Sequence, residues 1–161
     1  MALLPKSHIA ILSLRGLSLV FLLMSLLLLA NNSPTYEVDG TPYRFAAFES
    51  YSYMFGISVI GIGYTLLQTI AFVILQIMMI NNKYLVFAFY GDKAISYLLA
   101  SAASAGIGAS RDVHGVLEGT SQQHIAAYIS KGFAAAGLLL PAFVCTAILS
   151  IISSYALPKK V

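Results

Sequence analysis

Two charged residues inside apolar segments are the strongest candidates for a chemical role. Arg15 follows Ile9 by six residues and Asp92 follows Leu85 by seven, in stretches otherwise dominated by apolar side chains. An isolated charge at the centre of a bilayer costs at least about 2.5 to 3.5 kcal/mol. If both segments cross a membrane in the same direction, both charges lie roughly 9 to 10 Å from the same edge, at about 1.5 Å per residue. This matching depth predicts an ion pair between helices; the alternative is that each side chain extends separately to the membrane surface, with Lys93 beside Asp92.

Other residue types that could carry chemistry do not form a recognisable site. His114 and His124 accompany Asp112 and Glu118 in a polar stretch, but a gap of ten residues between the histidines matches no compact zinc-ligand spacing. The chain has one cysteine, Cys145, so it cannot form an intrachain disulfide. It contains neither a glycine-rich phosphate loop nor an HExxH motif. We therefore predict no catalytic residue, no metal or cofactor site, and no enzymatic activity.

Two further patterns predict helix packing. Small residues recur every four positions in the third apolar segment. Such residues let helices approach closely in lipid. The small residues are Ser96, Ala100, Ser104 and Gly108. We expect this face to pack against another helix of the same chain, with a seam between two copies as the alternative. In the second segment, Gln68 lies next to Thr65 and Thr69 and can form hydrogen bonds across helices.

The elements that hold these residues follow from composition. Of 161 residues, 59% are apolar and 9% are charged, and the mean hydropathy is +0.85. A soluble domain carries roughly 25% charged residues, whereas helices in lipid satisfy their backbone hydrogen bonds internally and present apolar side chains to lipid. The net charge is +3, but the basic residues are scattered singly. The composition thus indicates a polytopic membrane protein whose environment is the lipid bilayer, and not a nucleic-acid-binding protein.

The order of apolar and polar segments predicts an all-α bundle of four transmembrane helices in a single domain, residues 1–161. The helices are expected at about 9–30, 51–79, 85–109 and 131–157. Residues 31–50 and 110–130 form two outer loops, and residues 80–84 form an inner turn. The first segment has an alternative interpretation as a cleavable signal peptide, because Lys6 and Arg15 resemble its basic region. Leu28 and Ala30 make a poor cleavage site, so we expect the segment to be retained.

Basic residues set the expected orientation. Lys6 and Arg15 lie at the start of the first helix, and no basic residue follows that helix until Arg44. Because the first helix usually dominates orientation and basic flanks stay in the cytoplasm, we expect both termini there.

Three stretches resemble one family of plant membrane proteins. They are LRGLSLV at residues 14–20, GYTLLQ at 63–68 and FYGDKAISYLLASAASA at 89–105. Together they are similar to the first, second and third helices of the Casparian strip membrane domain protein-like (CASP-like) family. The likeness covers nearly the whole chain, and its YGD and YLLxSAASA elements are fairly specific.

The resemblance implies a fold and a role. The family has four membrane helices with cytoplasmic termini and is related to the MARVEL domain proteins. Its arginine in helix one and aspartate in helix three correspond to Arg15 and Asp92. The resemblance implies a plant plasma-membrane scaffold that forms homodimers and heterodimers. The first outer loop, EVDGTPYRF at residues 37–45, lacks the signature of the scaffold-forming members, so localisation to the Casparian strip is not implied.

Two functional hypotheses follow from the sequence. In the first, the protein is a non-enzymatic scaffold that acts by association in the plasma membrane and takes no small-molecule substrate. In the second, it is a small transporter or channel subunit. A transporter usually places an ionisable residue near the centre of the bilayer, whereas Arg15 and Asp92 are expected near its edge. This difference favours the scaffold.

Overall fold

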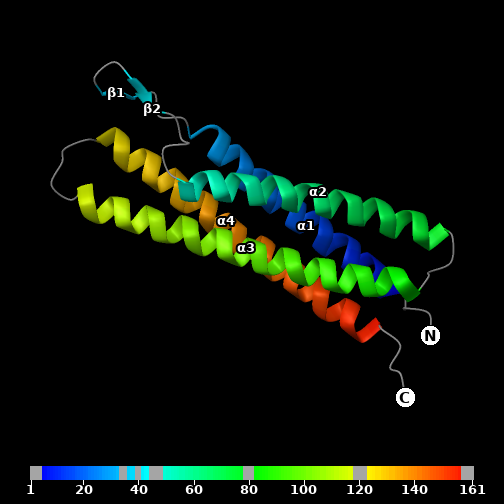
Figure 1. Ribbon diagram of the computed structural model, residues 1–161. Coiled ribbons are helices and arrows are strands. Elements are labelled where there is room, and N and C mark those ends of the chain that lie inside the picture. The colour runs from blue at the N-terminus through cyan, green and yellow to red at the C-terminus, as the bar shows by residue number, and fades with distance from the viewer. Residues whose placement is uncertain are drawn as a thin grey trace.

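The protein is an all-α bundle of four long helices, seen in a computed structural model (Figure 1). The structure describes residues 5–32, 36–38, 41–43, 49–77, 82–117 and 123–156, and side chains within 9–32, 49–74, 86–112 and 129–155. The helices are α1 (Pro5–Ala30), α2 (Glu49–Ile77), α3 (Asn82–Leu117) and α4 (Gln123–Ala156). Two short strands, β1 (Tyr36–Val38) and β2 (Thr41–Tyr43), pair antiparallel between α1 and α2. The predicted fold class is confirmed.

Local sequence explains several helix boundaries. Pro5 opens α1, where its fixed backbone angle and missing N–H suit the first helical position. Glu49 opens α2, where its negative charge complements the helix dipole.

Pro141 lies inside α4 and does not end it. A proline is tolerated inside a membrane helix because neighbouring groups can satisfy the backbone carbonyl that it leaves without a hydrogen bond.

Two expected loops have different boundaries in the structure. The sequence predicts an outer loop at residues 110–130, but α3 continues to Leu117 and α4 already begins at Gln123. Polar residues such as Arg111 and Asp112 mark the end of the apolar, membrane-spanning part of a helix. The helix itself can continue beyond them. At the opposite end, α3 begins at Asn82 inside the expected turn 80–84, and residues 80 and 81 lie outside the described residues.

The described parts of α1, α2 and α4 contain segments that are long and apolar enough to cross a membrane: Ile9–Ala30, Glu49–Ile74 and Ile129–Tyr155. Helix α3 is long enough, but Asp92, Lys93 and many Ala, Ser and Gly residues make it less apolar. It packs against α2 and α4 in the bundle (Figure 1). We treat it as the fourth membrane helix because its neighbours hold it at the same depth.

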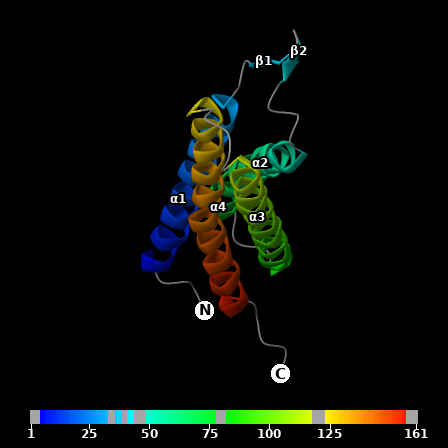
Figure 2. The same ribbon diagram turned by 90° about the vertical axis from the view of Figure 1, so that its left-hand side faces the viewer.

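The helices form a four-cornered ring. Neighbours around the ring are α1 with α2, α2 with α3, α3 with α4, and α4 with α1, so that α1 and α3 occupy opposite corners. Figure 2 shows that the first turn of α1 and the last turn of α4 lie at one end of the bundle, with β1 and β2 at the other. We call these the terminal end and the hairpin end.

The core lies where the four helices converge. Leu22 of α1, Met54 of α2, Leu99 of α3 and Leu139 of α4 are fully buried. Gly61 of α2 lies against this core, because a Cβ atom there would be 3.3 Å from Leu22 Cδ1 and 3.6 Å from Leu99 Cδ2.

Hydrogen bonds join the helices nearer the hairpin end. The hydroxyl groups of Tyr51 on α2 and Ser110 on α3 lie 2.8 Å apart, and both residues are buried. Gly132 of α4 lies directly against the Tyr51 ring, since a Cβ atom there would be 2.6 Å from the tyrosine hydroxyl oxygen. Ser25 of α1 donates a hydrogen bond of 2.9 Å to the carbonyl oxygen of Ala135 on α4. The bundle is therefore joined by specific polar contacts as well as by apolar packing.

Candidate functional site

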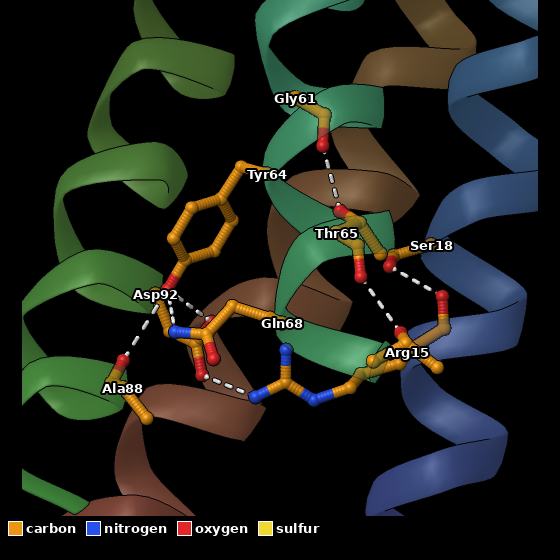
Figure 3. Close-up of polar contacts among 9 residues, drawn as sticks. Arg15, Ser18, Gly61, Tyr64, Thr65, Gln68, Ala88 and Asp92 are labelled. Carbon is orange, nitrogen blue, oxygen red and sulfur yellow. Dashed lines mark hydrogen bonds and ion pairs between the residues drawn. The ribbon is translucent and has the colours of Figure 1, made fainter. Parts of the chain in front are cut away.

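The structure brings Arg15 and Asp92 together inside the bundle. Arg15 Nη2 lies 3.2 Å from Asp92 Oδ2, and the two side chains are only 3% and 1% exposed (Figure 3). Their helices occupy opposite corners of the ring, so the ion pair crosses the bundle diagonally. Neither side chain extends to the membrane surface, and Lys93 is exposed. The ion pair therefore joins α1 to α3 in the interior of the bundle.

A third helix completes this site. The Tyr64 hydroxyl of α2 donates a hydrogen bond of 2.9 Å to Asp92 Oδ1, the carboxylate oxygen that Arg15 does not use. Gln68, one turn further along α2, donates from Nε2 to the Tyr64 hydroxyl oxygen at 2.8 Å. The Tyr64 hydroxyl is also 3.5 Å from the Ala88 carbonyl oxygen, too long to compete for its single proton. We call Arg15, Tyr64, Gln68 and Asp92 the polar network.

A glycine makes the approach of Tyr64 possible. Gly91 lies on α3 next to Asp92, and a Cβ atom at this position would be 2.9 Å from Tyr64 Cε2 and Cζ and closer still to its hydroxyl. Any other residue would therefore push the tyrosine ring away from α3. The glycine lets α2 bring a hydroxyl group to the carboxylate.

The polar network is suited to holding helices together. Each oxygen of the Asp92 carboxylate has a donor, one from α1 and one from α2. Arg15 contributes a single ion-pair contact, and its buried Nε has no hydrogen-bond partner among the described residues. The Ser18 hydroxyl donates to the Arg15 carbonyl oxygen and so satisfies only the backbone of α1. Removal of one charge would leave the other buried without compensation.

The structure divides the predicted small face of α3. Ser96 is buried, Ala100 and Gly108 are half-buried, and Ser104 is exposed; a Cβ atom on Gly108 would have no neighbour within 4 Å. The buried small residues further along α3 are instead Ala102, Ala103 and Gly106. A Cβ atom on Gly106 would lie 3.0 Å from the Ala136 Cβ of α4.

Spacing explains this division. Residues four apart differ by about 40° in direction, because each residue of a helix turns by about 100°. A row with steps of four therefore winds around the helix. It begins on the buried side at Ser96 and reaches the exposed side at Ser104.

The other candidate side chains do not join the polar network. Thr65 and Thr69 donate to carbonyl oxygens of their own helix at 2.7 Å, and only Gln68 of that group contributes to it. Cys145 is buried on α4 as a free thiol. The side chains of His114 and His124 lie outside the described part of the chain. Within the described part, no three His, Cys, Asp or Glu residues are grouped as metal ligands.

Comparison with known proteins decides the family. The Casparian strip membrane protein domain model matches residues 5–145. The chain belongs to the CASP-like family. It is 44% identical to CASP-like protein 4D1 of Ricinus communis over 96% of this chain and 95% of that protein. It is 43% identical to CASP-like protein 4D1 of Populus trichocarpa, over 96% and 90%. CASP-like protein 4D2 of Arabidopsis thaliana is 35% identical, over 94% and 91%. No solved structure matches this CASP-like chain.

Sequence reasoning missed the role of Tyr64 in this CASP-like protein. It identified Gln68 as a hydrogen-bonding group but not the tyrosine one turn before it. The signal was present in the spacing, since residues four apart lie on the same helix face and a buried tyrosine hydroxyl needs a partner.

Proposed function

We propose that this CASP-like chain is a non-enzymatic scaffold of the plasma membrane that acts by associating with copies of itself and with related membrane proteins. It is a single membrane domain with both termini in the cytoplasm. The observation that carries the proposal is that the ionisable groups inside the bundle are used to join helices. Arg15 and Asp92 bind each other, Tyr64 donates to the remaining carboxylate oxygen, and Gln68 donates to the Tyr64 hydroxyl.

The distribution of apolar surface supports the same proposal. The exposed faces of α1, α2 and α4 carry large apolar side chains, as at Leu27, Leu67 and Ile151. Such faces are suited to contact with lipid. Contacts with other proteins are then expected on the parts of the helices that are less apolar. Membership of the family is a further support, because the matching family model is described as a Casparian strip membrane protein domain.

Photobleaching tests the scaffold. The full chain, tagged with a fluorescent protein at its C-terminus, is expressed in plant epidermal cells, and a small region of plasma membrane is bleached. We expect a bleached region that persists, whereas an unrelated four-span plasma-membrane protein should recover within seconds. Equally fast recovery of both proteins would contradict an immobile scaffold.

Association is tested separately. Two full-length copies with different affinity tags are expressed together, and one tag is used for purification from membranes. We expect the second copy to be recovered, and to be absent when the two membranes are mixed only after detergent is added. Failure to recover the second copy would contradict self-association.

A further inference from the structure

The interior of the bundle changes from apolar at its centre to polar toward the terminal end. Arg15 and Asp92 each lie seven residues before a core leucine, Leu22 on α1 and Leu99 on α3, and so about 10 Å nearer the terminal end. Buried polar side chains from all four helices surround this depth. They are Arg15, Ser18, Thr65, Gln68, Asp92, Ser96, Thr146 and Ser150. We call this region the polar interior.

A contact elsewhere in the bundle places the α4 members of this group. Ser25 of α1 donates to the carbonyl oxygen of Ala135 on α4, and the two helices run in opposite directions (Figure 2). Arg15 is ten residues before Ser25. The same depth on α4 is therefore reached about ten residues after Ala135, because both helices rise equally per residue. Thr146 lies there and is buried.

Arg15 has more hydrogen-bond donors than partners. A guanidinium group carries five N–H groups. Arg15 makes one polar side-chain contact, from Nη2 to Asp92, and its buried Nε has no partner among the described residues. A buried donor without a partner is costly, and more so on a charged group. The site therefore needs an acceptor beside Nε that the protein does not supply.

The hydroxyl groups of the polar interior have the opposite property. Ser18, Thr65 and Thr146 each donate to a backbone carbonyl oxygen of their own helix at 2.7 to 2.9 Å, as Figure 3 shows for the first two. A hydroxyl group has one hydrogen and two acceptor lone pairs. These bonds use the hydrogen and leave the oxygen able to accept. Spare donors on Arg15 and spare acceptors on its neighbours therefore occur at one depth.

We propose that the polar interior binds water, with one molecule that accepts a hydrogen bond from Arg15 Nε and donates to neighbouring hydroxyl oxygens. Water both accepts and donates, and a buried molecule typically makes about three hydrogen bonds. An anion could accept from Nε, but it could not donate to the hydroxyl oxygens and would be repelled by Asp92. A metal cation would be repelled by Arg15. Water is therefore the ligand whose chemistry matches both sets of groups.

The apolar core limits how far this water extends. The side chains that meet at the centre are fully buried and apolar; they are Leu22, Met54, Leu99 and Leu139. An apolar interior does not hold water. Arg15 is about 9 Å along the axis from Ile9, where the apolar segment of α1 begins at the terminal end. Water thus enters from the terminal end and stops at the core. This inference does not depend on association between copies.

Solid-state NMR of the full chain in lipid bilayers tests the hydration of Arg15. The changes Arg44→Lys and Arg111→Lys leave Arg15 as the only arginine. The protein is labelled with ¹⁵N-arginine and with methionine carrying a ¹³C methyl group, and the transfer of magnetisation from water protons to each label is timed. A Met54→Leu variant identifies the Met54 methyl signal.

We expect rapid transfer to the Arg15 Nε–H group and slow transfer to the Met54 methyl group, because Met54 is fully buried in the apolar core. Equally slow transfer to both groups would show that the polar interior is dry and would overturn the proposal. Equally rapid transfer would overturn the limit that the core is proposed to set.

A matched pair of serine variants tests the acceptors. Ser18 and Ser58 are both fully buried, and each donates to a carbonyl oxygen of its own helix. Ser18 is three residues from Arg15, whereas Ser58 lies on the hairpin side of Gly61, away from the polar interior. We expect Ser18→Ala to slow the transfer from water to Arg15 Nε–H, because the bound water loses an acceptor.

Ser58→Ala should leave that transfer unchanged. Equal effects of the two serine changes would mean that hydroxyl oxygens near Arg15 do not hold the water, and the proposed bridge would be rejected. A dry polar interior would leave the scaffold proposal intact, because photobleaching and co-purification measure association and not hydration.

Discussion

Arg15 and Asp92 lie 3.2 Å apart although their helices occupy opposite corners of the bundle. The ion pair therefore acts across the interior and couples two helices that are not neighbours in the ring. Tyr64 brings a third helix to the same carboxylate. Four predictions follow from the polar network and the orientation of the bundle.

Asp92→Asn should destabilise the protein more than removal of both charges. The variant leaves Arg15 buried without a counter-charge, and breaking a well-buried pair typically costs about 3 to 5 kcal/mol. The double variant Arg15→Leu with Asp92→Leu leaves no charge behind. The yield of monodisperse protein after extraction from membranes measures both effects. The exchange Arg15→Asp with Asp92→Arg should recover part of the yield lost in either single reversal, and purely additive losses would mean that the charges are not partners.

Tyr64→Phe should weaken the bundle by about 1 to 2 kcal/mol, because the hydrogen bond to a charged carboxylate and the hydrogen bond from Gln68 to the tyrosine hydroxyl are both lost. Thermal unfolding in detergent measures the change. Tyr155→Phe is the control, since Tyr155 is 87% exposed near the end of α4. A Tyr64→Phe variant as stable as the Tyr155→Phe variant would show that α2 does not depend on this contact.

Gly91→Ala should destabilise the bundle because the added methyl group would overlap the Tyr64 ring. Gly63→Ala should be neutral or slightly stabilising, since Gly63 is exposed in the middle of α2 with nothing within 4 Å of its Cβ position. The same thermal unfolding assay compares them. In a Tyr64→Ala background the Gly91→Ala change should lose most of its effect. If Gly91→Ala still lowered the thermal stability by the same amount in that background, the added methyl group would not be acting through the Tyr64 ring.

Both termini should be protected from protease in intact cells. The first turn of α1 and the last turn of α4 lie at one end of the bundle, and the basic flank of α1 favours the cytoplasm for that end. Epitope tags at Met1 and Val161 should be digested only after the plasma membrane is made permeable. Digestion of either tag from outside intact cells would overturn the orientation.

Sequence alone predicts features that depend on depth and composition. Apolar segment length predicts four helices, which the fold confirms. The similar number of residues from one edge predicts that Arg15 pairs with Asp92. These inferences need only the rise per residue and the cost of a charge in lipid.

Depth and composition do not predict which side of a helix a residue lies on. The spacing of four groups Ser104 with Ser96, but the row winds around the helix and Ser104 is exposed. The contact between Gly91 and the Tyr64 ring depends on how closely α2 approaches α3. The ends of α3 and α4 were missed because polar residues mark the membrane surface, whereas helices continue beyond it.

The diagonal ion pair also has a consequence for synthesis. Arg15 and Asp92 are 77 positions apart, so α1 leaves the ribosome and enters the membrane well before α3. During that interval Arg15 has no counter-charge, and its long side chain must reach for the surface. Membrane helices can insert first and pack afterwards, so the pair closes only after the third helix has arrived. A chain that stops after α2 keeps an unneutralised cation, and closure of the pair therefore requires that α3 has been inserted.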